Sequence, residues 1–353
     1  MKKILSITLL ISLLLLLFSC SFGEGKDSDA GKSKTISTSY FNTFSVIYTF
    51  GENADTNIEK YAAISEECLS YYHKLFDIYF EYAGVNNIRT INRNAGKEPV
   101  KVDRELVDFL VYCKELFTIT GGKTNIMLGS VLKIWHDVRD MAEDDFGYLA
   151  PERLPSDASL TEAMTHTSID SLIIDEEACT VYISDPKASI DVGAIAKGYT
   201  VDILAQRLIS EGAQSVALNI GGNLRTIGLK PSGANWVTGI TNPDKEAEDS
   251  LKCRIEIGEC SVVTSGDYER YFTAGDKKYH HIIDPDTLYP ADYFSSVSII
   301  TESSGLADAL STALFCMSYE DGLALIESLS DVEVLWIYKD GEVKHTDGVR
   351  IIE

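Results

Sequence analysis

The order of helical and strand-like patterns along the chain constrains its fold most strongly. Apolar residues recur at helical spacing over residues 55–79, and a second helical pattern runs from Asp103 to about Thr120, where Gly121 and Gly122 stop it. Strand-like patterns dominate the middle of the chain. Strict alternation of strands and helices would predict a parallel α/β sheet, and strands alone would predict a sandwich. The order is neither, so it predicts a mixed α+β fold with long N-terminal helices and a strand-rich core.

The remaining elements are expected from shorter patterns of apolar, turn and glycine residues. Single strands are expected at residues 37–50, 215–220, 236–241, 252–257, 260–264 and 296–301. Hairpins are expected at 172–174 with 180–183 and at 332–338 with 342–352, and helices at 199–211, 306–317 and 320–329. The acidic residues 140–168 are expected to form a surface insertion.

The N-terminus has the features of an export signal rather than of a folded segment. Lys2 and Lys3 precede an apolar run at residues 4–18, which is short for a membrane-spanning helix and stops next to Cys20. The pattern resembles a bacterial lipoprotein signal, in which the cysteine is lipidated and becomes the first residue of the mature protein. An ordinary signal peptide with an incidental cysteine is the alternative. We therefore expect a lipid-anchored protein that works outside the cytoplasm.

Three segments follow from this interpretation: a signal peptide at 1–19, a flexible tether at 20–34 and one domain at 35–353. The tether is rich in Gly, Ser, Asp and Lys, so it cannot bury a core. Two or more acyl chains on Cys20 would anchor the protein stably to the cell membrane, whereas a single chain would not.

Charge and cysteine spacing argue against two classes of function. The chain has 31 Lys and Arg against 54 Asp and Glu, a net charge of −23, and such a surface repels the phosphates of nucleic acids. The seven cysteines include no CxxC pair and no zinc-site spacing, which argues against a thiolate metal site.

Two glycine-bounded turns are candidates for binding an anionic ligand. The first runs from Asp191, at a strand end, through Lys197 and Gly198 into a helix. Such a turn presents backbone N–H groups and a helix N-terminus to a phosphate, and Lys197 adds a positive charge. A plain strand–turn–helix joint with a surface lysine fits the pattern equally well. The second turn, at residues 219–223, is a weaker signal because a simple turn has the same composition.

Two further patterns supply candidate catalytic and metal-binding side chains. His280 and His281 precede an Asp-Pro turn, and adjacent side chains on a strand point to opposite faces, so at most one of them is expected to enter a site. Asp308 and Thr312 are four residues apart on an expected helix and share a face. Such a pair can bind Mg²⁺ together with phosphate oxygens and a backbone carbonyl. Taken alone, a capping Asp with a Thr bonded to the preceding turn is the simpler explanation.

Together these patterns offer phosphate-binding turns, a lysine, a hard-metal pair and a histidine, which suit phosphoryl or nucleotidyl transfer. Their order resembles that of the ApbE family of FAD:protein FMN transferases. The matching segments are DxGAIAKGYxxD, NIGGN, TSGDYER, HHIIDP and ADALSTALF, and the resemblance runs from about Thr35 to the C-terminus. It implies an exported, Mg²⁺-dependent enzyme that cleaves FAD, releases AMP and attaches FMN to a Thr or Ser hydroxyl. The implied acceptor is an extracytoplasmic redox protein of a membrane electron-transfer system.

The resemblance also implies roles for individual residues. Those implied to line the FAD site are Phe41, Tyr79, Lys123, Thr124, Asn125, Asp191, Lys197 and Ile282. The Ala194 carbonyl, Asp308 and Thr312 are implied to hold Mg²⁺, and His281 to accept the proton of the acceptor hydroxyl.

Two positions depart from the family pattern. Phe41 begins a Phe-Asn-Thr segment where Met-Gly-Thr is usual, and Leu288 stands where many members have Gly. Because a left-handed conformation costs a residue such as Leu about 1–2 kcal/mol, the turn at Leu288 is expected to differ locally. Two alternative functions stay open: an FAD pyrophosphatase that releases free FMN, and a non-catalytic flavin-binding lipoprotein.

Overall fold

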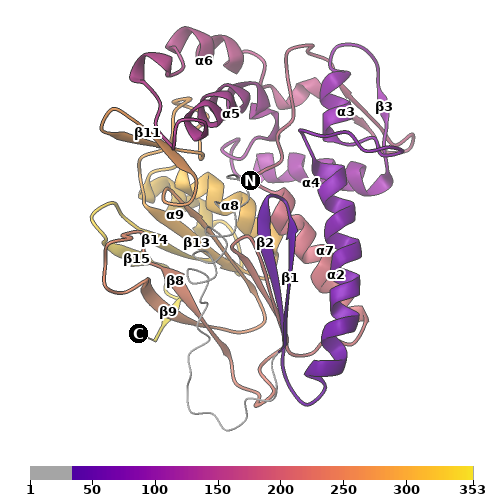
Figure 1. The fold of residues 1–353 in the computed structure, drawn as a ribbon, viewed down its shortest axis with the longest axis vertical. Coiled ribbons are helices and arrows are strands. Elements are labelled where there is room, and N and C mark those ends of the chain that lie inside the picture. The colour runs from indigo at the N-terminus through magenta and orange to yellow at the C-terminus, as the bar shows by residue number, and fades with distance from the viewer. Residues whose placement is uncertain (1–33, 353) are drawn as a thin grey trace, which may run out of the picture.

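The structure is a computed structural model that describes residues 34–352 (Figure 1). The helices are α2 (Ala54–Phe76), α3 (Ile88–Arg93), α4 (Arg104–Ile119), α5 (Gly129–Glu143), α6 (Asp157–Met164), α7 (Ala196–Ser210), α8 (Ser304–Phe315) and α9 (Tyr319–Glu327). The strands are β1 (Lys34–Tyr40), β2 (Thr43–Thr49), β3 (Val100–Lys101), β4 (Leu172–Asp175), β5 (Thr180–Ile183), β6 (Val216–Ile220), β7 (Asn223–Ile227), β8 (Trp236–Thr241), β9 (Leu251–Ile257), β10 (Ser261–Gly266), β11 (Tyr271–Ala274), β12 (Lys277–His280), β13 (Ser296–Thr301), β14 (Glu333–Ile337), β15 (Val343–His345) and β16 (Arg350–Ile351).

The N-terminal predictions concern residues that are almost all outside this range. The signal at 1–19, the lipidation site Cys20 and the tether up to residue 33 lie outside the described residues, and Lys34 already begins β1. Among residues 34–352, no helix has the length and hydropathy that a membrane crossing requires.

An eight-stranded sheet forms the centre of the fold (Figure 1). Its strand order is β1-β2-β6-β7-β10-β13-β14-β15, and every neighbouring pair is antiparallel. The chain between β7 and β10 leaves this sheet, because β8 and β9 pair with each other and β9 with β16 in a separate three-stranded sheet. The mixed α+β prediction is confirmed.

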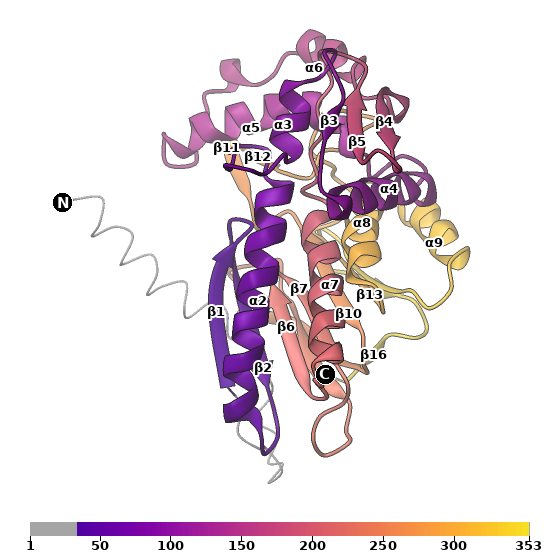
Figure 2. The same cartoon turned by 90° about the vertical axis from the view of Figure 1, so that its right-hand side faces the viewer.

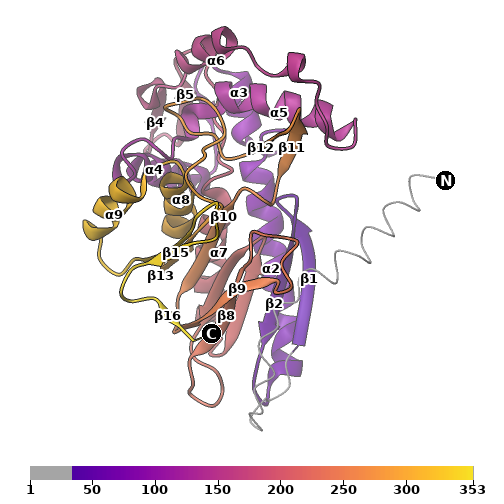
Figure 3. The same ribbon diagram turned by 90° about the vertical axis from the view of Figure 1, so that its left-hand side faces the viewer.

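Alternating side chains bury both faces of the large sheet. On β14, Val334 and Trp336 pack with side chains of α8 and α9, whereas Leu335 and Ile337 pack with side chains of β8 and β9. Figure 2 shows α2, α7 and α8 along one face, where they contact β2, β7 and β10 respectively. Figure 3 shows β8, β9 and β16 on the other side. The helices that carry the candidate site therefore share one face of the sheet.

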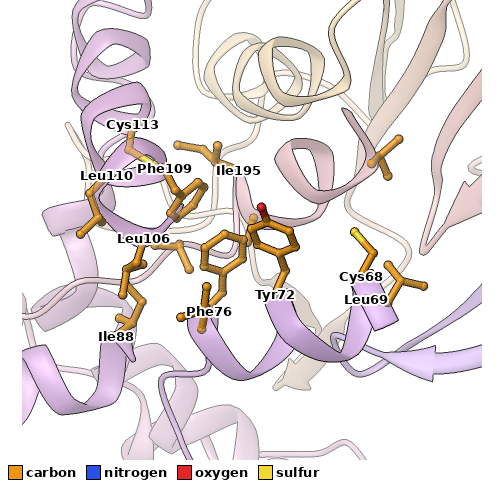
Figure 4. Close-up of a cluster of buried hydrophobic side chains, with 14 of the residues drawn as sticks. Cys68, Leu69, Tyr72, Phe76, Ile88, Leu106, Phe109, Leu110, Cys113 and Ile195 are labelled. Carbon is orange, nitrogen blue, oxygen red and sulfur yellow. The ribbon is translucent and has the colours of Figure 1, made fainter. Parts of the chain in front are cut away.

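A core of aromatic and aliphatic side chains joins α2, α4 and α7 (Figure 4). The ring centroids of Phe76 on α2 and Phe109 on α4 are 4.0 Å apart, and Tyr199 on α7 lies 5.0 Å from Phe109. Ile195, which immediately precedes α7, is fully buried in the same cluster. Burial of such a side chain contributes about 1.5–3 kcal/mol. The core thus fixes the start of α7, where the phosphate-binding turn was predicted.

Helices α3 to α6, the β3–β5–β4 sheet and the β11–β12 hairpin gather at one end of the molecule (Figures 1 and 2). Helix α6, within the expected surface insertion at 140–168, is exposed at most of its residues, and its buried Leu160 packs in a small core with Trp135 of α5 and Phe272 of β11. Trp135 also donates a hydrogen bond from Nε1 to the Leu288 carbonyl, over 2.9 Å. This core connects α5 to the β11–β12 hairpin, which leads into the histidine pair.

Several expected elements have different limits in the structure. Residues 37–50 are two strands of one hairpin rather than a single strand, with Phe41 and Asn42 at its turn in left-handed conformations (φ 54° and 52°). The C-terminal residues 342–352 form two strands rather than one, since β15 pairs with β14 whereas β16 pairs with β9. Helix α5 and strand β7 were not predicted. Leu288 has a φ of 65°, so the argument that Leu would avoid the left-handed conformation is wrong.

Candidate active site

The turn after Asp191 leads directly into α7 and is closed by side-chain and backbone hydrogen bonds. Asp191 Oδ1 accepts a hydrogen bond from the Gly193 N–H at 2.9 Å, and the Asp191 N–H donates to the Ile126 carbonyl at 2.8 Å. The helix starts at Ala196, three residues earlier than the sequence pattern indicated. Lys197 is therefore in the first helical turn, where the helix dipole favours a negative ligand.

Asp308 of α8 lies against this helix start. Its Oδ2 accepts a hydrogen bond from the Gly198 N–H at 2.9 Å and lies 3.7 Å from Lys197 Nζ, and the residue is only 5% exposed. Gly198 is required for this approach, because a Cβ there would be 2.2 Å from the Ser304 carbonyl oxygen and 2.7 Å from Asp308 Cβ. The structure thus holds a carboxylate and a lysine side by side at the start of α7.

The donors proposed for Mg²⁺ fit a hard cation in chemical type. Asp308 and Thr312 are one turn apart on α8, and Ala194 lies in the turn that precedes α7. A buried carboxylate, a hydroxyl and a backbone carbonyl are the oxygen ligands that Mg²⁺ accepts, and substrate phosphates usually complete its shell. Across the described residues, no three His, Cys, Asp or Glu side chains gather to form a metal cluster. A cation at this place would accordingly depend on Asp308 as its charged protein ligand.

Tyr79, predicted to contact the flavin, lies in a polar group with Asp191. The Tyr79 hydroxyl is 3.3 Å from His136 Nδ1, and His136 Nε2 is 3.9 Å from Asp191 Oδ2. Burial and the Asp191 carboxylate raise the pKa of Tyr79. Burial lowers the pKa of His136, against the opposing effect of Asp191. Tyr79 is nevertheless 44% exposed, so its ring remains available to a ligand.

The two adjacent histidines have different environments, as predicted. His280 is buried, with Nε2 2.7 Å from the Ala291 carbonyl and its ring edge-on to Phe315. His281 is exposed, and its Nδ1 is 3.3 Å from the Arg270 carbonyl. That contact favours the tautomer with hydrogen on Nδ1, which leaves Nε2 as a proton acceptor. Although His281 is accessible to solvent, protein atoms surround its ring closely, and this desolvation, together with the positive charge of Arg270, lowers the pKa of His281.

The side chains of Lys123, Thr124 and Asn125 all form hydrogen bonds or ion pairs within the protein. Lys123 Nζ bridges Asp284 Oδ1 at 2.9 Å and Asp286 Oδ2 at 2.8 Å. Burial opposes the charge of Lys123, but these two hydrogen bonds raise its pKa. Thr124 donates to the Ala309 carbonyl of α8 at 2.7 Å and is 2% exposed. Asn125 accepts from the Met127 N–H at 2.9 Å and donates to the Thr167 carbonyl at 3.0 Å.

The remaining predicted residues occupy the borders of this region. Ile282 is 5% exposed and packs in the core under α8, so only its backbone is available for polar contact with a ligand. Phe41 lies at the tip of the β1–β2 hairpin, where its ring is edge-on to His73 with centroids 5.6 Å apart.

Sequence reasoning missed His136 and Arg139, which lie on the unpredicted helix α5. They line one small cavity together with Arg270 and His281. Arg270 belongs to the TSGDYER segment, so a sequence motif pointed to its place near the site. No motif pointed to His136, because nothing in the sequence connects residue 136 with a turn 55 residues later. The six cysteines of the described part are free thiols, so no disulfide joins these elements.

Comparison with known proteins gives consistent matches over most of the chain. The model of the ApbE family matches residues 42–336. A relative from Treponema pallidum, named FAD:protein FMN transferase, is 33% identical over 276 residues, which cover 74% of this chain and 73% of the relative. A relative of the same name from Klebsiella pneumoniae is 30% identical over 259 residues, which cover 73% of this chain and 77% of the relative.

Solved structures agree with the sequence matches. The ApbE protein of Thermotoga maritima superimposes with a TM-score of 0.76 and 28% identity, covering 90% of this chain and 97% of that one. The flavin transferase ApbE of Vibrio cholerae gives a TM-score of 0.73 with 26% identity, covering 89% and 96%. The family model spans most of the described residues, and relatives named as transferases match about three quarters of the whole chain. The chain therefore belongs to the ApbE family.

Proposed function

We propose that this protein is an Mg²⁺-dependent FAD:protein FMN transferase that moves FMN from FAD to a Thr or Ser hydroxyl of an acceptor protein and releases AMP. The names of its relatives support the flavin chemistry. The observation that carries the proposal is the pairing of the Asp308 carboxylate with Lys197 at the start of α7. A buried carboxylate beside a lysine, at a helix N-terminus whose dipole favours anions, suits a bound cation and a pyrophosphate.

The protein's own groups have separate roles in this proposal. Asp308, Thr312 and the Ala194 carbonyl would hold Mg²⁺, which when bound neutralises phosphate charge and polarises the attacked phosphoryl group. Lys197 and the start of α7 bind the pyrophosphate. The ring of Tyr79 is exposed and would contact the flavin of bound FAD.

His281 supplies the general base. Its lowered pKa keeps the imidazole neutral at pH 7, and Nε2 is the free acceptor nitrogen. Nε2 takes the proton of the acceptor hydroxyl while that oxygen bonds to the phosphorus of FMN. The P–O bond to AMP breaks, and AMP leaves with its electron pair.

We further propose that the protein acts outside the cytoplasm, anchored by a lipid on Cys20, and that its acceptor is an extracytoplasmic protein of a membrane electron-transfer system. The apolar run that stops next to Cys20 supports the anchor. The acidic composition argues against a nucleic-acid partner.

A pair of substitutions on α8 tests the metal-dependent function. Asp308→Asn removes the only charged protein ligand at nearly constant volume and should abolish transfer. Thr312→Val removes a neutral ligand and should impair transfer less. EDTA should stop the wild-type reaction, and added Mg²⁺ should restore it. Transfer by folded Asp308→Asn at the wild-type rate would contradict the proposal.

A further inference from the structure

Helices α7 and α8 each place an aspartate carboxylate against the first turn of the other helix. Asp308 of α8 accepts a hydrogen bond from the Gly198 N–H in the first turn of α7. In return, Asp202 of α7 accepts from the first turn of α8: Oδ1 from the Ser304 N–H at 2.7 Å, and Oδ2 from the Gly305 N–H at 2.8 Å. Each carboxylate thus neutralises free N–H groups of the other helix.

The spacing of these contacts fixes both the separation and the register of the two helices. Gly198 and Asp202 are four residues apart on α7, as are Ser304 and Asp308 on α8, so the two contacts lie one turn apart along the same helix faces. The helices cannot slide without breaking both contacts. The absence of a side chain at Gly198 allows the backbones to come this close.

Asp202 does more than cap α8, because α8 already has a cap of its own. Ser303 Oγ accepts a hydrogen bond from the Leu306 N–H at 3.2 Å, which is the usual N-cap interaction. The same hydroxyl donates to Asp202 Oδ2 at 2.8 Å. Asp202 therefore receives three hydrogen bonds that all join α7 to α8, and it makes none to the proposed site itself.

We propose that Asp202 is a positioning residue that holds the Asp308 carboxylate in place to bind the divalent cation. The proposal rests on the proposed function, since it assumes a cation at Asp308. Residues that support metal ligands from behind typically change metal affinity by about 10–100-fold when they are substituted. Asp202→Asn keeps the volume but places an amide NH₂ among three hydrogen-bond donors, so α8 should shift and Asp308 should bind the cation more weakly.

The test is Mn²⁺ binding to FAD-saturated protein without acceptor, with free Mn²⁺ measured by electron paramagnetic resonance. Asp202→Asn should raise the Mn²⁺ dissociation constant about tenfold or more. It should leave FAD affinity, measured by flavin fluorescence without metal, within about twofold of wild type. High Mn²⁺ should restore transfer in this variant, which a general loss of structure would not allow.

Asp185→Asn is the matched control, because Asp185 Oδ1 also accepts a backbone N–H, that of Lys187 at 2.8 Å, on a loop outside α7 and α8. Its Mn²⁺ affinity should be unchanged. If Asp202→Asn does not fold, Ser303→Ala removes one of the three donors and should weaken Mn²⁺ binding by a smaller factor.

The outcomes separate the two proposals. Wild-type protein that binds FAD but no Mn²⁺ contradicts the metal site of the proposed function. The positioning role alone is overturned if wild-type protein binds Mn²⁺ and the folded Asp202→Asn variant binds it equally well. Ser303→Ala takes the place of Asp202→Asn in this comparison if Asp202→Asn does not fold.

Discussion

Gly198→Ala should disturb the proposed site and also lower the stability of the fold. A Cβ at residue 198 would lie 2.2 Å from the Ser304 carbonyl oxygen, whereas real Cβ contacts are essentially never below 3.0 Å. The first turns of α7 and α8 must therefore separate by about 1 Å to reach van der Waals contact, given the overpacking that a dense interior resists. The Gly198 N–H would then lose its 2.9 Å hydrogen bond to Asp308.

The two free-energy effects on stability oppose each other. Overpacking costs about 1–3 kcal/mol, and Ala in place of Gly stabilises a helix interior by about 1 kcal/mol. The lost hydrogen bond to the Asp308 carboxylate costs about 1.5–3 kcal/mol more, so the free energy of unfolding should fall by about 1.5–5 kcal/mol. In the molecules that stay folded, Asp308 is no longer oriented by this hydrogen bond, and metal-dependent transfer should fall about tenfold or more.

Urea unfolding and a transfer assay on the same samples measure both effects. Gly322→Ala is the control, because Gly322 is a helical glycine on α9 whose nearest neighbour is the movable Leu314 Cδ2 at 3.2 Å. It should leave transfer unchanged. The argument fails if Gly198→Ala retains wild-type transfer, or if its loss of transfer is matched by general unfolding.

Three other predictions concern single side chains. Lys197→Ala should weaken FAD binding more than tenfold without unfolding the protein, since a charge-assisted contact is worth about 1.5–3 kcal/mol; unchanged affinity by calorimetry would remove Lys197 from the site. Because the pKa of His281 is lowered, its imidazole stays neutral as pH falls through 6.5, and the acidic limb of kcat/KM should lie below that value. A limb at or above pH 6.5 that disappears in His281→Gln would refute this assignment. Cys20→Ser should release the processed protein from membranes, and a wild-type N-terminal peptide without lipid by mass spectrometry would contradict the anchor.

The sequence predicts those elements whose signals are local. The helical spacing at 55–79 becomes α2, and the acidic turn between 172–174 and 180–183 becomes the β4–β5 hairpin. The glycines after α4 both have positive φ, as a helix stop requires. Asp308 and Thr312 indeed share a turn of α8, because their spacing alone determines it.

The predictions that proved wrong concern features that depend on contacts between segments far apart in the sequence. The pattern of residues 342–352 predicts one strand, but in the structure Arg350 and Ile351 form β16, which pairs with β9. Leu288 has a left-handed conformation, and its carbonyl accepts a hydrogen bond from Trp135, 153 residues earlier. The contact of Asp202 with α8 arises from the packing of α7 on α8, and the spacing of apolar residues in the sequence does not predict that packing.

The most direct test of the proposed function is a product analysis with purified mature protein, FAD, Mg²⁺ and a candidate acceptor protein. The account predicts covalent flavin on the acceptor, seen by in-gel fluorescence and intact mass, with one AMP formed for each FMN attached and none after EDTA. Release of AMP with free FMN alone, whichever acceptor is offered, would indicate a pyrophosphatase. Bound but intact FAD in the presence of Mg²⁺ and acceptor would contradict the enzymatic account and favour a flavin-binding protein.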